Sequence, residues 1–151
     1  MYKRILVPTD GSAHAGQAVT AAVDYARATG AVVVAFSVAQ PYPMLPGVEG
    51  AMMLDPVVDS AELQALARQA VETVARTALA AGVACEAHTA LSFVPYEEII
   101  RAVGEYQCDV IFMASHGRRG LSRLLAGSQT QKVLAYSTIP VLVLRPAPPA
   151  P

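Results

Sequence analysis

Five short apolar runs alternate with four amphipathic segments along this chain, and this alternation limits the possible folds more than any other feature. Most of the runs are continuous and rich in β-branched residues, as in strands that are covered on both faces. The runs comprise residues 3–8, 31–39, 83–91, 109–113 and 139–144. Strict alternation of strands and helices predicts an α/β fold, with a parallel sheet and helices on both faces.

The segments between the runs have apolar residues at helical spacing and clear end signals. Ser12 is a favourable N-cap for the first helix, and Gly30 ends it. The second helix begins with a capping-box pattern, Asp59 and Glu62, and ends at Gly82. Its buried stripe is expected to consist of Leu63, Leu66, Ala67, Ala70, Val71, Val74, Ala75 and Ala78. The third helix starts at Pro95, and the fourth runs from about Ser128 to Tyr136.

The third apolar run is the exception, because its residues alternate. Val83, Cys85 and Ala87 face one side, while Ala84, Glu86 and His88 face the other. This alternation predicts a half-exposed strand at an edge of the sheet, with His88 on the surface. His14 is also expected on the surface.

Two loops have the composition of a ligand site. One is Pro8-Thr9-Asp10-Gly11-Ser12 after the first strand, and the other is the stretch 113–129 after the fourth. Ligands of parallel sheets bind beyond the strand C-termini, where the winding direction reverses. With right-handed crossovers, a strand order 3-2-1-4-5 would bring both loops into one crevice.

The stretch 113–129 contains Gly117, Gly120 and Gly127, which can expose backbone amides to an anion just before a helix. Arg118, Arg119 and Arg123 supply positive charge nearby. The alternative is a glycine-softened turn with solvated arginines. Neither Gly-x-x-x-x-Gly-Lys-Ser/Thr nor Gly-x-Gly-x-x-Gly occurs, so the pattern is a loose one.

Two polar residues beside these loops have two interpretations each. Asp10 is either a turn residue or an acceptor for an adenine amino group or a ribose hydroxyl. His116 is either a hydrogen-bonding loop residue or a ligand contact. There is no Gly-x-Ser-x-Gly elbow and no metal-ligand spacing, so we expect no catalytic residues, no protein metal site and at most slow ATP hydrolysis.

Composition excludes several classes of protein. The net charge of -1 argues against nucleic-acid binding. No apolar run approaches the roughly 18 residues of a membrane span, and the N-terminal apolar run is too short for a signal peptide. Cys85 and Cys108 have no redox or metal spacing, which favours a cytoplasmic protein with bystander thiols.

The 151 residues are expected to form one domain, residues 1–146, followed by a disordered Pro/Ala tail, residues 147–151. Residues 40–57 contain four prolines and two glycines together with three methionines and two leucines. This segment is expected to be a lid, a contact surface or a floppy insertion.

From residue 2 to residue 145 the chain resembles the universal stress protein family. The nucleotide-binding branch of that family carries Gly, two residues, Gly, nine residues, Gly-Ser/Thr. Here Gly117 is followed by residues 118–126 and then by Gly127-Ser128, with Ala114 in place of the first glycine. Residues 5–12, 132–134 and 139–143 are similar to the family's first strand, closing helix and last strand.

This resemblance implies a single Rossmann-like domain, related to the adenine-nucleotide alpha-hydrolase fold, that binds ATP, ADP or AMP. Pro8, Thr9, Asp10 and Val38 would line the adenine and ribose pocket. The ribose and phosphates would be surrounded by Met113, Ala114, His116, Gly117, Arg118, Gly127, Ser128 and Gln129. Mg²⁺ or Mn²⁺ would bridge the phosphates. Phe93 stands where related proteins often have glycine, and its side chain is expected to crowd the ribose or close the pocket.

The resemblance also implies a homodimer in which the last strand, with Val141, Leu142 and Val143, pairs with its copy. Three functions follow as hypotheses. The first is a nucleotide-dependent, dimeric regulatory module of the stress response. The second is a dimeric interaction module that has lost the nucleotide. The third is a true ATP-dependent enzyme, for which the sequence supplies no catalytic residues.

Overall fold

The computed structural model describes residues 1–41, 60–116 and 126–146. Several expectations therefore fall outside the described residues. They are the role of the segment 42–57, the capping residue Asp59, the middle of the glycine-rich stretch with Gly117 and Arg118, and the tail 147–151.

The centre of the molecule is a parallel sheet. Its strands are β1 (Arg4–Pro8), β2 (Val32–Ala39), β3 (Cys85–Leu91), β4 (Val110–Ala114) and β5 (Val141–Leu144). Their order is β3-β2-β1-β4-β5, and every neighbouring pair is parallel. The predicted fold class and strand order are confirmed, including the edge position of β3.

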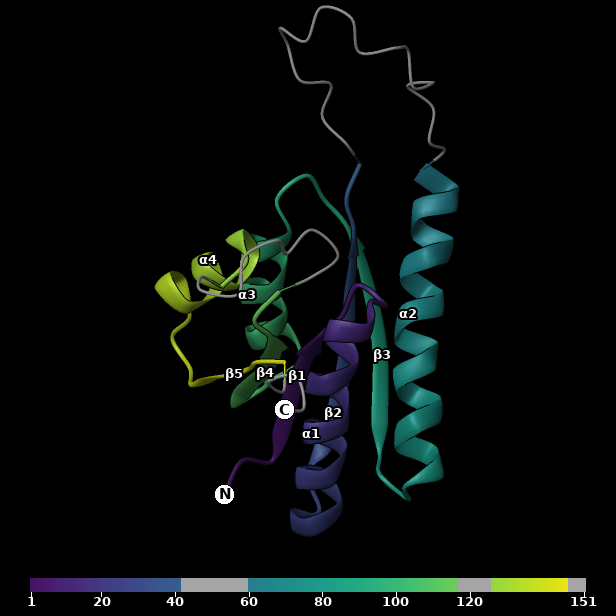
Figure 1. Ribbon diagram of the computed structural model, residues 1–151, viewed down its shortest axis with the longest axis vertical. Helices are drawn as coiled ribbons and strands as arrows, with labels where there is room; N and C mark the ends of the chain where they lie inside the picture. The colour runs from purple at the N-terminus through teal and green to yellow at the C-terminus, as the bar shows by residue number, and fades with distance from the viewer. Residues whose placement is uncertain (42–59, 117–125, 147–151) are drawn as a thin grey trace, which may run out of the picture.

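Two helices cover each face of this sheet (Figure 1). Helices α1 (Ala13–Thr29) and α2 (Ser60–Ala80) pack on one face, and α3 (Pro95–Glu105) and α4 (Ser128–Tyr136) pack on the other. Consecutive residues of β1 point to opposite faces, so Ile5 belongs to the first core and Leu6 to the second. Both residues are fully buried, which agrees with the continuous apolar run in the sequence.

The predicted ends of the first helix are confirmed. The Ser12 hydroxyl accepts a hydrogen bond from the Ala15 amide at 3.2 Å. Gly30 has a φ of 77°, in the left-handed region that glycine enters without strain, and its amide donates to the Ala26 carbonyl at 2.8 Å. The left-handed backbone of Gly30 therefore ends α1 at Thr29.

Two expectations about burial were wrong. Leu66 of α2 is 43% exposed although it lies on the predicted apolar stripe, and it lines the pocket described below. In β3, His88 was expected on the surface but is half-buried, as is Glu86 on the same side of the strand. The reason is that Glu86 binds the Arg4 side chain, and the His88 ring stacks on Tyr106 with their centroids 3.9 Å apart.

Candidate functional site

The polar side chains of the turn after β1 accept hydrogen bonds from the backbone of the same turn. The Thr9 amide continues the sheet ladder by donating to the Phe36 carbonyl at 2.9 Å. Thr9 Oγ1 then accepts from the Gly11 amide at 3.1 Å, and Asp10 Oδ1 accepts from the Ser12 amide at 2.9 Å. The predicted turn role of Asp10 is therefore observed, and the same residue also lines the pocket.

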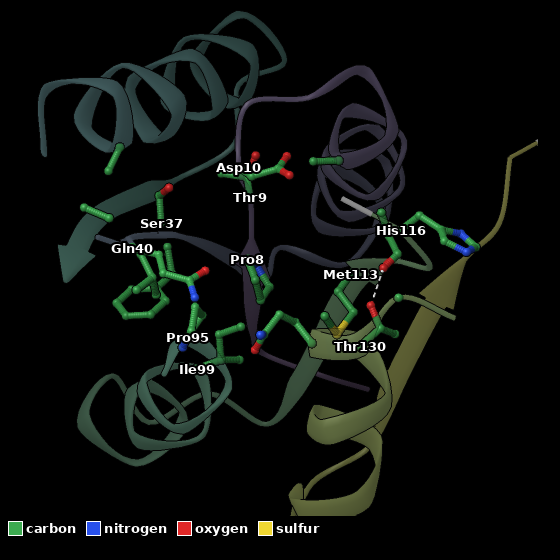
Figure 2. A pocket seen from close by; sticks show the side chains of 18 of the residues that line it. Pro8, Thr9, Asp10, Ser37, Gln40, Pro95, Ile99, Met113, His116 and Thr130 are labelled. Atoms are coloured by element: carbon green, nitrogen blue, oxygen red, sulfur yellow. Dashed lines mark hydrogen bonds between the residues drawn. The ribbon is translucent and has the colours of Figure 1, made fainter. Parts of the chain in front are cut away.

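The second wall comes from the end of β4 and the start of α4. The Ser115 amide donates to the Leu144 carbonyl at 2.8 Å, and the Gly127 amide donates to the Ser115 carbonyl at 2.6 Å. The Thr130 hydroxyl donates to the Ala114 carbonyl at 3.0 Å (Figure 2). These bonds fix the N-terminus of α4 against the end of β4.

Helix α4 starts without a side-chain cap, because its N-cap residue is Gly127. The first amides of a helix have no partner within the helix, and the helix dipole favours a negative charge beside them. The backbone of Gly127 is not in the left-handed region, so its φ of -60° does not require glycine. A Cβ there would lie 3.4 Å from the Ser115 carbonyl oxygen and 3.6 Å from His116 Cα, so a larger side chain would add atoms beside the end of β4.

The two loops border one pocket with a volume of about 530 Å³. Such a volume lies within the roughly 300–1,000 Å³ that is typical of small-molecule sites. The pocket brings together ten of the twelve predicted site residues: Pro8, Thr9, Asp10, Val38, Met113, Ala114, His116, Gly127, Ser128 and Gln129. The strand order therefore joins segments that lie about a hundred residues apart in the sequence.

Other lining residues were not predicted. They are Ala15, Phe36, Ser37, Ala39, Gln40, Leu63, Leu66, Ala67, Pro95, Ile99 and Thr130. Ser37 interrupts the apolar run near the C-terminal end of β2, and Gln40 directly follows that run. Since the C-terminal ends of parallel strands share one edge, these polar residues were a usable signal. No local sequence pattern predicted that residues of α2 and α3 would line the pocket.

Gln129 has a structural contact that sequence reasoning missed. Its Oε1 accepts a hydrogen bond from the Tyr96 amide at 3.0 Å, in the first turn of α3. The N-cap residue of α3, Val94, makes no side-chain cap. Gln129 therefore supplies an acceptor for α3 from a different helix and ties α3 to α4 beside the pocket.

His116 borders the pocket, but Figure 2 shows its ring directed away from the pocket centre. His116 Nδ1 and Ser115 Oγ are 3.0 Å apart. Within the part of the chain that the structure describes, the buried Nε2 has no hydrogen-bond partner. The predicted role of His116 as a hydrogen-bonding loop residue is therefore observed for Nδ1 and not for Nε2.

Phe93 does not crowd the pocket as expected. Its side chain is 62% exposed, and Phe93 is not among the lining residues. Its carbonyl instead accepts a hydrogen bond from Gln40 Nε2 at 3.3 Å. Any residue at position 93 can provide that carbonyl.

Arg4, Glu86 and the Tyr106 carbonyl form a charged cluster at the N-terminal end of β1, which is the end away from the pocket. The Arg4 guanidinium donates to both Glu86 carboxylate oxygens at 2.9 Å and to the Tyr106 carbonyl at 2.8 Å. The hydrogen bond from Arg4 holds the pKa of Glu86 below its ordinary value. These groups neutralise one another at the start of β1, away from the pocket.

Three further features of the described residues concern metal ligands, a buried thiol and helix length. Among residues 1–41, 60–116 and 126–146, no group of three His, Cys, Asp or Glu side chains could hold a metal ion. Burial raises the pKa of the Cys108 thiol to about 11, so this thiol is protonated at neutral pH. Within the same residues, no helix is both long and apolar enough to cross a membrane.

Comparison with known proteins identifies relatives along nearly the whole chain. The chain is 34% identical to universal stress protein MJ0531 of Methanocaldococcus jannaschii, over 96% of this chain and 83% of that protein. It is also 34% identical to a universal stress protein of Thermus aquaticus, named for its position 3′ of a QAH/OAS sulfhydrylase, over 96% of this chain and all of that protein.

Solved structures agree with the sequence relatives. The structure of MJ0577 from M. jannaschii superposes with a TM-score of 0.77 at 25% identity and covers 98% of this chain and 99% of its own. Two further structures share the fold at lower identity. A universal stress protein in complex with cAMP has a TM-score of 0.66 at 22% identity, covering 95% of this chain and 97% of its own. A family protein from Arabidopsis thaliana with AMP bound has a TM-score of 0.65 at 15% identity, covering 96% and 92%.

The model of the universal stress protein family matches residues 1–145. This match includes every strand of the sheet and both loops that border the pocket. The chain therefore belongs to the universal stress protein family.

Proposed function

We propose that this pocket binds an adenine nucleotide, ATP or its relatives ADP and AMP. The observation that carries the proposal is the uncapped N-terminus of α4, which borders a pocket of about 530 Å³. Two hydrogen bonds hold this helix end against β4: Thr130 to the Ala114 carbonyl at 3.0 Å, and the Gly127 amide to the Ser115 carbonyl at 2.6 Å. Backbone amides at such a helix end are suited to a phosphate. The cAMP and AMP complexes of two proteins with the same fold support an adenine nucleotide as the ligand.

The rest of the pocket suits a nucleoside. Val38, Met113 and Ile99 provide apolar walls for a flat base, while Thr9, Asp10 and Ser37 provide polar groups for its edge and for a ribose. A sugar hydroxyl or a ring amino group can pair with such groups when water is excluded. With ATP, the phosphate oxygens would bring Mg²⁺ or Mn²⁺ into the site.

We further propose that the protein acts in the cytoplasm as a nucleotide-dependent, dimeric regulatory module of the stress response, with at most slow ATP hydrolysis. β5 lies at the end of the strand order, so its outer edge has no neighbouring strand within the described residues. Leu142 on this strand is 45% exposed. An unprotected apolar edge strand favours pairing with a second copy, through Val141, Leu142 and Val143.

Nucleotide binding is tested by thermal unfolding with and without AMP, ADP or Mg-ATP, and by analysis of nucleotide released from the purified protein. A ligand at 100 times its dissociation constant adds about 2.7 kcal/mol, which raises the melting temperature by roughly 5–11 °C in a chain of this length. If no adenine nucleotide raises the melting temperature and none is released, the proposal is wrong and an interaction module without nucleotide takes its place.

The variant Gly127→Val tests the position of the phosphates. Its Cβ fits at ordinary contact distances, and its methyl groups would add bulk beside the uncapped start of α4, where we place the phosphates. We expect this variant to fold but to lose the nucleotide-dependent rise in melting temperature. Gly104→Val is the matched control, because a Cβ at Gly104 meets nothing within 4 Å. Normal nucleotide binding by Gly127→Val would show that the phosphates lie elsewhere.

A further inference from the structure

Gln40 lies at the edge of the pocket with its side-chain amide held in one orientation. It follows the last residue of β2 and lines the pocket. Its Nε2 donates a hydrogen bond to the Phe93 carbonyl at 3.3 Å. Figure 2 shows the amide oxygen of Gln40 directed toward the pocket centre and the nitrogen toward the side of Pro95.

The backbone around this contact is itself fixed. The Ser92 amide donates to the Ala39 carbonyl at 3.0 Å, so the segment after β3 stays beside the end of β2. The Val94 amide in turn donates to the Ser92 hydroxyl at 3.1 Å. The Phe93 carbonyl therefore has a defined position from which it accepts from Gln40.

The orientation of the amide decides what Gln40 offers to a ligand. A carbonyl oxygen only accepts hydrogen bonds, so the Phe93 carbonyl requires the NH₂ end of Gln40. The end that remains toward the pocket is Oε1, which is also only an acceptor. By contrast, the hydroxyls of Ser37 and Thr9 can donate or accept, so they do not distinguish donors from acceptors on a ligand.

We propose that Gln40 is a specificity-determining residue, which selects a purine with an amino group at position 6 over one with a keto group there. This inference rests on the proposed adenine-nucleotide site. A 6-amino group donates to Gln40 Oε1. A 6-keto oxygen would face Oε1 as a second acceptor, and the amide could donate a hydrogen bond to that oxygen only by rotating and giving up its bond to Phe93.

The experiment measures dissociation constants for AMP and IMP by calorimetry on the whole chain. The two nucleotides differ in the group at position 6 and in the proton that IMP carries on N1. Leaving a polar group unpaired in a partly buried site costs about a factor of ten in affinity. We expect wild type to bind AMP about tenfold more tightly than IMP. Gln40→Leu is expected to weaken AMP binding and to bring the two constants within about threefold of each other. Gln40→Glu keeps an acceptor and is expected to keep the preference.

Gln69→Leu serves as the matched control, since Gln69 lies on an exposed part of α2. It is expected to leave both constants unchanged. If Gln40→Leu keeps the wild-type ratio, or weakens AMP and IMP equally, Gln40 does not select the base and the nucleotide site itself still stands. If wild type binds neither AMP nor IMP, the nucleotide site is wrong and the role of Gln40 falls with it.

Discussion

The Thr130 hydroxyl is the contact whose removal tests most directly how the start of α4 is positioned. Thr130 is 4% exposed, lines the pocket, and donates to the Ala114 carbonyl at 3.0 Å. Thr130→Val keeps the shape and the β-branch of the side chain but removes the donor. The loss of one buried hydrogen bond, with its acceptor left behind, costs about 1–3 kcal/mol.

This cost can be followed in two assays. Urea unfolding is expected to show a free energy of unfolding lower by about 1–3 kcal/mol, which corresponds to a fall in melting temperature of roughly 2–12 °C. Calorimetry is expected to show weaker binding of AMP with little change for adenosine. The reason is that the proposed site places the phosphate at the first turn of α4 and the base and ribose against other segments.

Two further variants separate positioning from a general loss of stability. Thr130→Ser keeps the hydroxyl and is expected to restore AMP binding, at a cost of about 0.8 kcal/mol for the lost methyl group. Thr73→Val removes a similar hydroxyl from an exposed part of α2, where it donates to the Gln69 carbonyl at 2.9 Å. It is expected to change stability by less than about 0.5 kcal/mol. The reasoning is refuted if Thr130→Val is as stable as wild type, or if adenosine and AMP lose affinity equally.

Two other predictions concern the sheet edge and the charged cluster. Leu142→Lys places a charge on the exposed edge strand, so sedimentation should show a dimer for wild type and a monomer for the variant; a dimeric variant would mean that the copies pair elsewhere. For Glu86, Arg4 holds the carboxyl pKa below the ordinary 4.5, so the folded state binds fewer protons there than the unfolded state. Its stabilising effect is present above pH 4.5 and is lost as the pH falls through the lowered pKa. Glu86→Gln should therefore show a smaller drop in melting temperature below pH 4.5 than wild type, and an identical drop would contradict this role.

Local features of the fold were predictable because each depends on residues close together in the chain. The cap at Ser12 involves an amide three residues away, and the end of α1 at Gly30 needs only one residue in the left-handed region. The strand order followed from the alternation of elements and from the composition of two loops. By contrast, His88 was expected on the surface, and its half-buried position depends on Tyr106, which is distant in the sequence.

The candidate site likewise combines features that the sequence predicted with contacts that it did not. Ten predicted residues meet in one pocket because the first and fourth strands are neighbours, which the sequence pattern already indicated. Gln129 was predicted as a ligand contact, yet its side-chain oxygen accepts from Tyr96, 33 residues away. Phe93 was expected to obstruct the pocket, yet its side chain is exposed and only its carbonyl contacts Gln40.

The sequence alone determined the class of fold, the order of the strands and the edge of the sheet at which the candidate pocket lies. These properties follow from the spacing of apolar residues and from helix and turn signals, which act over a few residues. The tertiary structure alone decided how the pocket is walled and what its polar groups offer. The pairs Gln40–Phe93 and Thr130–Ala114 are 53 and 16 residues apart, so their hydrogen bonds exist only after the strands and helices have packed. Packing also sets the direction in which each amide and hydroxyl points, and no local pattern encodes that direction.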